Sequence, residues 1–298
     1  MERELPIYKL NGINFHVEIK KAELIEVETP FLNIIKVNEL VDAGTHYVLH
    51  WNELDKNQDT YQAYIRRNLG ERNKTNQPAH QSAFSKFKEE QQDNIVHIPP
   101  LKNLDPLGMS TQYHVSLEAL KTMTDYEIMV NQHLLKRRQL GVLPILRIGL
   151  HDFLVDIQSN AILPLVRSTA QRINLSSLER FEKKGGSGYV VPWDMKSGQI
   201  AKTEFHNLTQ LPLHIKYVEI PPKDLLDPYG YYLRYGNEEE LRIALRTIPL
   251  KEKTEARTLD WNETGIPALI EKNNQEKLSI WAKGQVGKRI KSRVKRSI

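Results

Sequence analysis

The chain has 298 residues and none of them is cysteine. This absence excludes disulfide bonds, thiolate metal sites, iron–sulfur clusters and a cysteine nucleophile, although it is compatible with either redox environment. No run of about 18 apolar residues occurs, so the sequence predicts no membrane span. The first residues lack the apolar stretch of a signal peptide, and we therefore expect a cytoplasmic protein.

The sequence also lacks the motifs of common catalytic sites. It contains no Gly-x-Ser-x-Gly elbow, no His-Glu-x-x-His helix and no dinucleotide fingerprint. The glycine-rich run 185–188 lacks the Lys-Ser/Thr end of a phosphate loop and precedes an expected strand instead of a helix. No spacing of acidic residues singles out an acid and a base. We therefore expect neither an enzyme nor a cofactor.

In place of such motifs the chain carries an internal repeat. Three blocks match in the same order: residues 5–40 with 143–178, residues 47–52 with 189–194, and residues 98–108 with 220–230. In the first block Phe15 corresponds to Phe153 and Val17 to Val155, at an offset of 138. Three collinear matches are hard to obtain by chance, so we predict a tandem duplication.

Each repeat opens with the alternation of apolar and polar residues that is typical of an antiparallel β-meander. Asn11-Gly12 is a strong signal for a two-residue hairpin in the first repeat. Residues 149–152 and then Ser159-Asn160 stand at the turns of the second repeat. Further strands are expected around residues 47–52 and 189–194.

Each repeat closes with short helices. Asp105 and Asp227 directly precede a proline, as an N-cap does, and the predicted helices run to Tyr113 and Tyr235. A second short helix is expected in each repeat, and a longer helix over about residues 125–139 leads from the first repeat into the second.

The second short helices begin near Ser116 and near Asn237, where Glu240 completes a capping-box spacing. Two short helices joined by a tight turn resemble part of a helix-turn-helix motif that reads DNA. Three carboxylates at 238–240 would repel phosphate, however, so we favour a structural role for this element.

Trp51 and Trp193 occupy equivalent positions in the expected strands. An exposed aromatic side chain on a sheet can stack on bases, but a tryptophan repeated in each domain is more typical of a core anchor. We predict that both are buried. His46 and His50 lie in the same strand pattern, and their counterparts are Gly188 and Pro192, so we predict no metal site.

The repeats define the expected domains. The first covers residues 1–140 and includes a polar insertion at about 53–95, the second covers 141–250, and a linker with a basic tail covers 251–298. We predict an α+β fold with two tandem homologous domains, each a small antiparallel β-meander with short terminal helices, followed by a basic C-terminal helix.

The net charge of +5 is concentrated in the tail. Residues 283–298 contain seven basic residues and no acidic one, and the rest of the chain has 35 basic and 37 acidic residues. On a helix, an apolar stripe forms at every fourth position: Val286, Ile290, Val294 and Ile298. Six basic residues cover the remaining circumference: Lys288, Arg289, Lys291, Arg293, Lys295 and Arg296.

A basic amphipathic helix has several possible partners. It can contact phosphates, dock on a protein or lie on an anionic membrane, and a charge run is also common in a solvated terminus. Gly284 and Gly287 weaken the start of this helix, which is compatible with folding on binding. Our main hypothesis is a non-enzymatic protein whose six basic residues contact phosphates of DNA or RNA without sequence preference. The alternative is a protein-interaction adaptor that docks through the apolar stripe or the paired repeats.

A last indication comes from four short segments, residues 104–113, 116–120, 124–132 and 143–156. They resemble a group of uncharacterised duplicated-domain proteins that are frequent in Bacteroidota, often in several copies and sometimes near mobile elements. The resemblance covers most of residues 5–240. It implies a bacterial cytoplasmic setting and an association with mobile DNA, and it implies no activity and no site residue.

Overall fold

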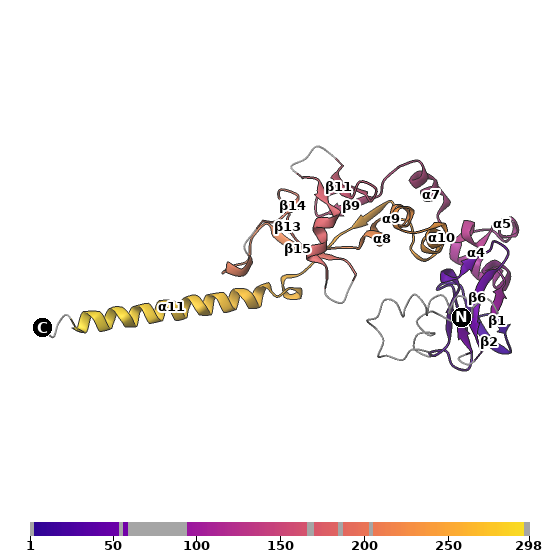
Figure 1. Ribbon diagram of the computed structural model, residues 1–298, viewed down its shortest axis with the longest axis horizontal. Helices are drawn as coiled ribbons and strands as arrows, with labels where there is room; N and C mark the ends of the chain where they lie inside the picture. Colours follow the sequence, from indigo (N-terminus) through magenta and orange to yellow (C-terminus); the bar gives the residue numbers. More distant parts are fainter. Residues whose placement is uncertain are drawn as a thin grey trace, which may run out of the picture. The chain divides into compact units, whose positions relative to one another are not determined.

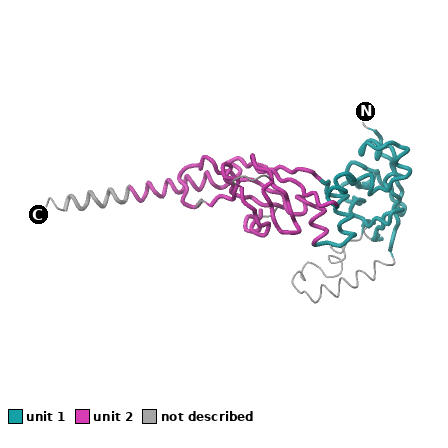
Figure 2. The backbone as a smooth tube through the Cα atoms, turned by 90° about the horizontal axis from the view of Figure 1, so that it is seen from above, with its two compact units in different colours: residues 1–139, 235–250 teal, residues 140–234, 251–298 magenta. Residues whose placement is uncertain are grey.

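The computed structural model describes residues 3–53, 56–58, 94–165, 170–183, 187–202 and 205–294, with backbone alone from 282 onward. These residues combine helices with largely antiparallel sheets, so the α+β class is confirmed. The chain divides into two compact units (Figure 2). Unit 1 consists of residues 1–139 and 235–250, and unit 2 consists of residues 140–234 and 251–298.

Unit 1 contains two small sheets and a set of short helices (Figure 1). Its strands are β1 (Ile7–Leu10), β2 (Ile13–Glu18), β3 (Glu23–Glu26), β4 (Ile34–Lys36), β5 (Val41–Asp42), β6 (Tyr47–Asn52), β7 (Asn57–Gln58) and β8 (Ile95–Ile98). Its helices are the 3-10 helix η1 (Val37–Glu39), α3 (Leu101–Leu104), α4 (Pro106–Tyr113), α5 (Leu117–Thr122), α6 (Asp125–Met129), α7 (Gln132–Gln139) and α10 (Glu238–Thr247). The first sheet has the order β1-β2-β3-β4, and β6 pairs with β5, β7 and β8 in the second.

Unit 2 also contains two sheets. Its strands are β9 (Ile145–Ile148), β10 (His151–Asp156), β11 (Ala161–Pro164), β12 (Ile173–Asn174), β13 (Tyr189–Asp194), β14 (Gln199–Ile200), β15 (Ile215–Ile220), β16 (Lys253–Glu255) and β17 (Arg257–Thr258). Its helices are η3 (Leu175–Phe181), η4 (Phe205–Asn207), α8 (Lys223–Leu226), α9 (Pro228–Tyr235), η5 (Trp261–Glu263) and α11 (Ile266–Val294). The sheet orders are β12-β11-β10-β9-β16 and β14-β13-β15-β17.

The first strands of the two units have the same register. Tyr8 pairs with Phe15 and Leu146 with Phe153, at positions 138 residues apart in the chain. Asn11 and Gly12 both have positive φ, as the predicted hairpin requires. The corresponding turn in unit 2 is shorter than expected, because His151 already pairs with Ile148 in the strands.

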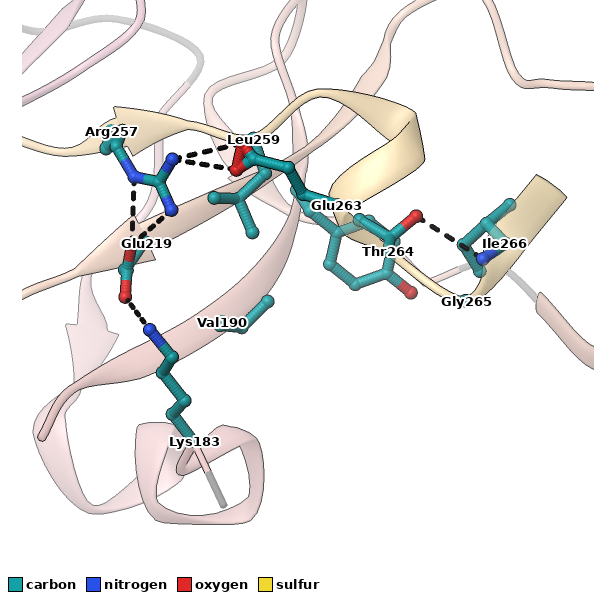
Figure 3. A pocket seen from close by; sticks show the side chains of 10 residues that line it. Lys183, Val190, Glu219, Arg257, Leu259, Glu263, Thr264, Gly265 and Ile266 are labelled. Atoms are coloured by element: carbon teal, nitrogen blue, oxygen red, sulfur yellow. Dashed lines mark hydrogen bonds and ion pairs between the residues drawn. The ribbon is translucent and has the colours of Figure 1, made fainter. Parts of the chain in front are cut away.

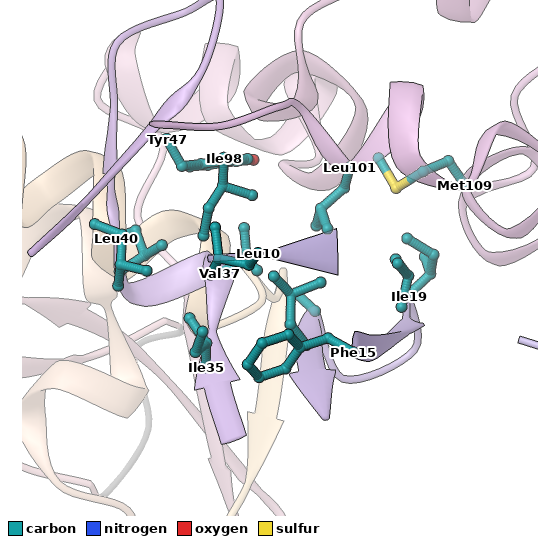
Figure 4. Close-up of a cluster of buried hydrophobic side chains, with 14 of the residues drawn as sticks. Leu10, Phe15, Ile19, Ile35, Val37, Leu40, Tyr47, Ile98, Leu101 and Met109 are labelled. Atoms are coloured by element: carbon teal, nitrogen blue, oxygen red, sulfur yellow. The ribbon is translucent and has the colours of Figure 1, made fainter. Parts of the chain in front are cut away.

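The cores lie between the sheets and the short helices. In unit 1, alternate strand residues such as Phe15 and Ile35 meet Leu101 and Met109 from the helices (Figure 4). Trp51 and Trp193 are fully buried, which confirms that both are core anchors. Neither indole Nε1 has a hydrogen-bond partner, so the two tryptophans stabilise the cores through apolar contact alone.

The Asp-Pro-x-Gly segments form helix N-termini as predicted. The Asp105 carboxylate accepts a hydrogen bond from Gly108 N at 2.9 Å, and the Asp227 carboxylate accepts one from Gly230 N at 3.0 Å. A Cβ on either glycine would lie within about 2.2 Å of the capping carboxylate oxygen. The glycine is therefore required because the cap and the third helical residue approach so closely.

The prediction of one long helix over residues 125–139 is wrong. Val130 has an extended backbone and separates α6 from α7. Its side chain is buried, and the Asn131 carboxamide accepts a hydrogen bond from Leu134 N at 3.0 Å, which caps the second helix. Burial of Val130 and this cap favour two helices over one.

The compact units differ from the domain boundaries drawn from the sequence. Residues 235–250 belong to unit 1 instead of continuing the second domain to residue 250, and residues 251–298 belong to unit 2. Helix α10 packs on η1, β5 and α6, whereas the following segment pairs with strands of unit 2. Tertiary contacts made far along the chain decide these boundaries. Most of the insertion predicted at 53–95 lies outside the described residues.

Candidate functional site

The predicted binding residues fall at the end of α11. Helix α11 spans Ile266–Val294, so residues 286–294 of the expected tail belong to its backbone. Their side chains are not described, and Lys295, Arg296 and Ile298 lie outside the described residues. Both hypotheses for the tail therefore remain predictions.

The first half of α11 is held in place by asparagines that the sequence analysis did not single out. The Asn273 carboxamide donates to the carbonyl oxygens of His206 and Leu208, both at 2.8 Å. Asn274 donates to the Thr209 carbonyl at 3.1 Å. Asparagine side chains in a helix can reach backbone groups outside it, but the sequence alone does not identify those groups.

An apolar group follows on the same helix. Leu278, Ile280 and Trp281 are each about two-thirds exposed or more, although they are large hydrophobic residues. Leu278 lies eight residues before Val286 and so continues the four-residue spacing of the predicted stripe toward the N-terminus. Leu278 and Trp281 are three residues apart and share one face of the helix, whereas Ile280 lies on another face. Neighbouring exposed apolar side chains indicate a binding surface more often than isolated ones do.

Unit 2 contains a pocket of about 390 Å³ (Figure 3). It is lined by β13, β15, β17, η5 and the start of α11. Its lining residues are Lys183, Val190, Tyr217, Glu219, Arg257, Leu259, Glu263, Thr264, Gly265 and Ile266.

Four charged side chains form an alternating chain along the pocket. Lys183 Nζ lies 2.7 Å from Glu219 Oε1, and Arg257 Nε donates to Glu219 Oε2 at 3.0 Å. Arg257 also donates to both oxygens of Glu263, at 2.7 and 3.0 Å. The hydrogen bonds from Lys183 and Arg257 lower the pKa of Glu219, so this carboxylate is ionised at neutral pH.

The pocket also has apolar lining residues. Val190, Leu259 and Ile266 contribute to its wall, and the Thr264 hydroxyl donates to the Trp261 carbonyl at 2.7 Å. Lys183 forms an ion pair with Glu219, so the charged groups that line the pocket are paired with one another.

A second polar cluster lies where α10 packs on unit 1. Arg246 is only 6% exposed, donates through Nη2 to the Leu40 carbonyl at 2.5 Å and lies over the Tyr47 ring. The Tyr47 hydroxyl donates to Asp125 at 2.8 Å, and burial raises the pKa of both groups. Arg242 Nη2 is 3.7 Å from Asp42 Oδ2. The cluster fixes α10 on unit 1, and the i,i+4 spacing of the two arginines was its only sequence signal.

Two further features of the described residues concern metal binding and membrane insertion. His46 and His97 stack at 4.1 Å between ring centroids, and the described residues contain no group of three or more acidic or histidine side chains able to hold a metal ion. In the part of the chain from residue 3 to 294 that is described, no helix is both long and apolar enough to cross a bilayer.

Comparisons of the chain with protein-family models, curated proteins and solved structures found no match. The function of the protein is therefore inferred from its fold and surfaces alone. The protein combines two α+β units with an internally ion-paired pocket and a long C-terminal helix.

Proposed function

We propose that the protein is a non-enzymatic binding protein whose C-terminal helix contacts the phosphates of a nucleic acid. The observation that carries the proposal is the extent of α11, whose backbone continues from Ile266 to Val294. The last acidic residue of the chain is Glu276, so only basic charges occupy the helix beyond it. Cations at the C-terminal end of a helix also interact favourably with its dipole.

The expected interaction is electrostatic. Residues 283–294 form a helical segment about 18 Å long at 1.5 Å per residue, and Lys288, Arg289, Lys291 and Arg293 lie on it. Lys295 and Arg296 extend the basic sequence. Each phosphate that such a segment neutralises releases counterions, which gives affinity that falls steeply with salt and has little sequence preference.

The proposal is tested by fluorescence anisotropy with a labelled duplex and a labelled single strand, at about 50 to 200 mM salt. We expect binding by the full chain, loss of binding when the chain ends at Ala282, and a strong salt dependence. The triple variant Lys288→Glu, Arg289→Glu, Lys291→Glu should also lose binding. Lys272→Glu, an exposed change on the same helix, is the matched control and should retain binding. No binding at low salt by the full chain would refute the proposal.

The alternative proposal is a protein-interaction adaptor, and the exposure of Leu278, Ile280 and Trp281 favours it. In this alternative the apolar stripe through Val286, Ile290, Val294 and Ile298 enters a groove of the partner. Ile290→Ala combined with Val294→Ala should then weaken partner capture more than charge reversal does. The opposite ranking supports contact with phosphates.

We further propose that the two units arose by tandem duplication in a bacterial cytoplasmic protein. The equal register of the first strands and the two Asp-Pro-x-Gly caps support the duplication. The bacterial cytoplasmic setting rests on the resemblance described above.

A further inference from the structure

The two units differ at one edge of their first sheets. In unit 2, β16 adds to β9 as a parallel strand, with Lys253 opposite Ile145 and Glu255 opposite Arg147. Ile145 N donates to the Glu252 carbonyl and Ala256 N to the Arg147 carbonyl. The next residues continue as β17 and pair with β15, so residues 252–258 cover one edge of each sheet, at β9 and at β15.

At the equivalent edge of unit 1 the described residues provide no such strand. Strand β1 pairs with β2 on one side, and within the described residues no strand pairs with its other side. Ile7, the counterpart of Ile145, is 61% exposed. Strand β8, the counterpart of β15, pairs only with β6 among the described strands.

The hydrogen-bonding groups on this edge have a defined direction. Val17 N donates to the Pro6 carbonyl, so Pro6, Tyr8 and Leu10 direct their backbone groups toward β2. Ile7 and Lys9 alternate with them and direct their N–H and C=O groups outward. Such an unpaired row is the template that an added strand requires.

The two edges differ in the carboxylates that lie next to them. In unit 2, Arg147 and Lys253 both contact Asp152, and Arg257 contacts Glu219. In unit 1 the two carboxylates are replaced by Asn14 and His97, at the same strand positions.

One cation remains at the edge of unit 1. Lys9 stands where Arg147 stands in unit 2, and it makes no ion pair with any described residue. If a strand with the sequence of residues 252–258 paired with β1 of unit 1, the cations at positions 253 and 257 would therefore have no carboxylate partners there. An acidic residue at the position of Glu255 would instead lie beside Lys9.

We propose that the outer edge of β1 binds an extended acidic segment of a partner protein, which adds as a parallel strand. The backbone groups of Ile7 and Lys9 supply the pairing, and Lys9 selects a carboxylate. This site is separate from the C-terminal helix and goes beyond the proposed contact with nucleic acid.

The test uses two labelled peptides of residues 250–259. One has the natural sequence, and the other carries Lys253→Gln and Arg257→Glu, which removes the two cations that lack partners at unit 1. We expect the acidic peptide to bind the full chain in anisotropy measurements at least fivefold more tightly than the natural one. Glu255→Gln in the acidic peptide should weaken its binding to the natural chain, because Glu255 would lie beside Lys9, and the variant Lys9→Glu should remove this dependence on Glu255.

Backbone pairing is tested at Ile7. Ile7→Pro removes an outward N–H without breaking a bond to β2, and edge strands tolerate proline at such positions. We expect at least a tenfold loss of peptide affinity, whereas Ile7→Thr, which keeps the N–H, should bind nearly as the natural chain does. Ile34→Pro places the same change on β4, the opposite edge of the sheet, and should leave affinity unchanged. Circular dichroism checks that each variant is folded.

The outcomes separate this proposal from the proposed function. The triple charge reversal on α11 should leave peptide binding intact, because the peptide site lies in unit 1. Peptide binding that survives Ile7→Pro but disappears with the charge reversal would assign the peptide to the basic helix and overturn the proposal. Equal affinity for both peptides, or no binding of the acidic peptide, would also overturn it.

Discussion

The two units begin alike and end differently. Both open with the same meander, bury an equivalent tryptophan and start a helix with an Asp-Pro-x-Gly cap. Unit 2 then receives two strands from residues 253–258, whereas unit 1 receives a helix, α10, from residues 238–247. At the edge formed by β9 in unit 2 a further strand pairs, whereas among the described residues none pairs with the outer side of β1 in unit 1.

Two units that begin with the same strands are thus completed differently, by strands in unit 2 and by a helix in unit 1. Residues 253–258 satisfy backbone groups at the edges of unit 2, which would otherwise remain available for pairing. Helix α10 instead buries Ala244, Leu245 and Arg246 against unit 1. The outer edge of β1, which has no strand partner among the described residues, is the place where the proposed peptide site differs from unit 2.

The largest expected effect concerns the feature that the units share. Trp51→Ala and Trp193→Ala each remove a fully buried side chain, and we expect each to lower the free energy of unfolding of its unit by about 3–5 kcal/mol. Replacement by Phe should cost less, because it also removes a buried indole N–H without a partner. Urea denaturation measures both. A negligible cost in only one unit would contradict the equivalence of the two tryptophans.

The next effect concerns the helix that only unit 1 receives. Arg246→Ala removes a buried cation and leaves the Leu40 carbonyl without its donor, so we expect a loss of about 2–4 kcal/mol. Arg242→Ala changes a more exposed side chain and should cost about 1 kcal/mol or less. Hydrogen exchange should show faster exchange in unit 1 and little change in unit 2. Equal acceleration in both units would argue against assigning α10 to unit 1.

A smaller effect tests the shared caps. Gly108→Ala and Gly230→Ala each place a Cβ against the capping carboxylate, and we expect losses of about 1–3 kcal/mol. Gly108→Ala should cost more, because its Cβ would also lie 2.8 Å from Ile19 Cγ1, whereas the contacts of Gly230 are confined to Asp227. Thermal unfolding of the two variants measures the ranking. The reverse order would show that the cap of unit 1 relaxes more easily.

The smallest effect is a pH dependence of the β9–β16 edge of unit 2. Arg147 and Lys253 lower the pKa of Asp152 to about 2, from an ordinary value of about 3.9. A carboxyl with a lowered folded pKa stabilises the fold above its unfolded pKa, and this contribution is lost as pH falls toward 2. The protection factors of the amides in β9 and β16, corrected for intrinsic exchange, should therefore fall between about pH 4 and 2. Asp152→Asn should remove this component, and β1, which faces Asn14, should lack it.

Much of the local structure could be predicted from the sequence. The hairpin at Asn11-Gly12, the caps at Asp105 and Asp227 and the burial of both tryptophans depend on residues close together in the chain or on simple alternation. The break at Val130 was missed because burial of one side chain and a cap from Asn131 outweighed continuous helix propensity. The pocket residues come from segments that are far apart, from Lys183 to Ile266, and no spacing reveals them.

The sequence by itself determined the repeated pattern, the first hairpin and the helix caps of the repeats, and the segregation of positive charge into the last residues. Those features follow from periodicity, turn chemistry and composition, which act over a few residues. Only the tertiary structure decided that residues 235–250 complete unit 1 and that residues 251–258 close the sheets of unit 2. The physical reason is that strand pairing and helix docking depend on which edges and faces remain unsatisfied, and these are defined only once the rest of the chain has folded.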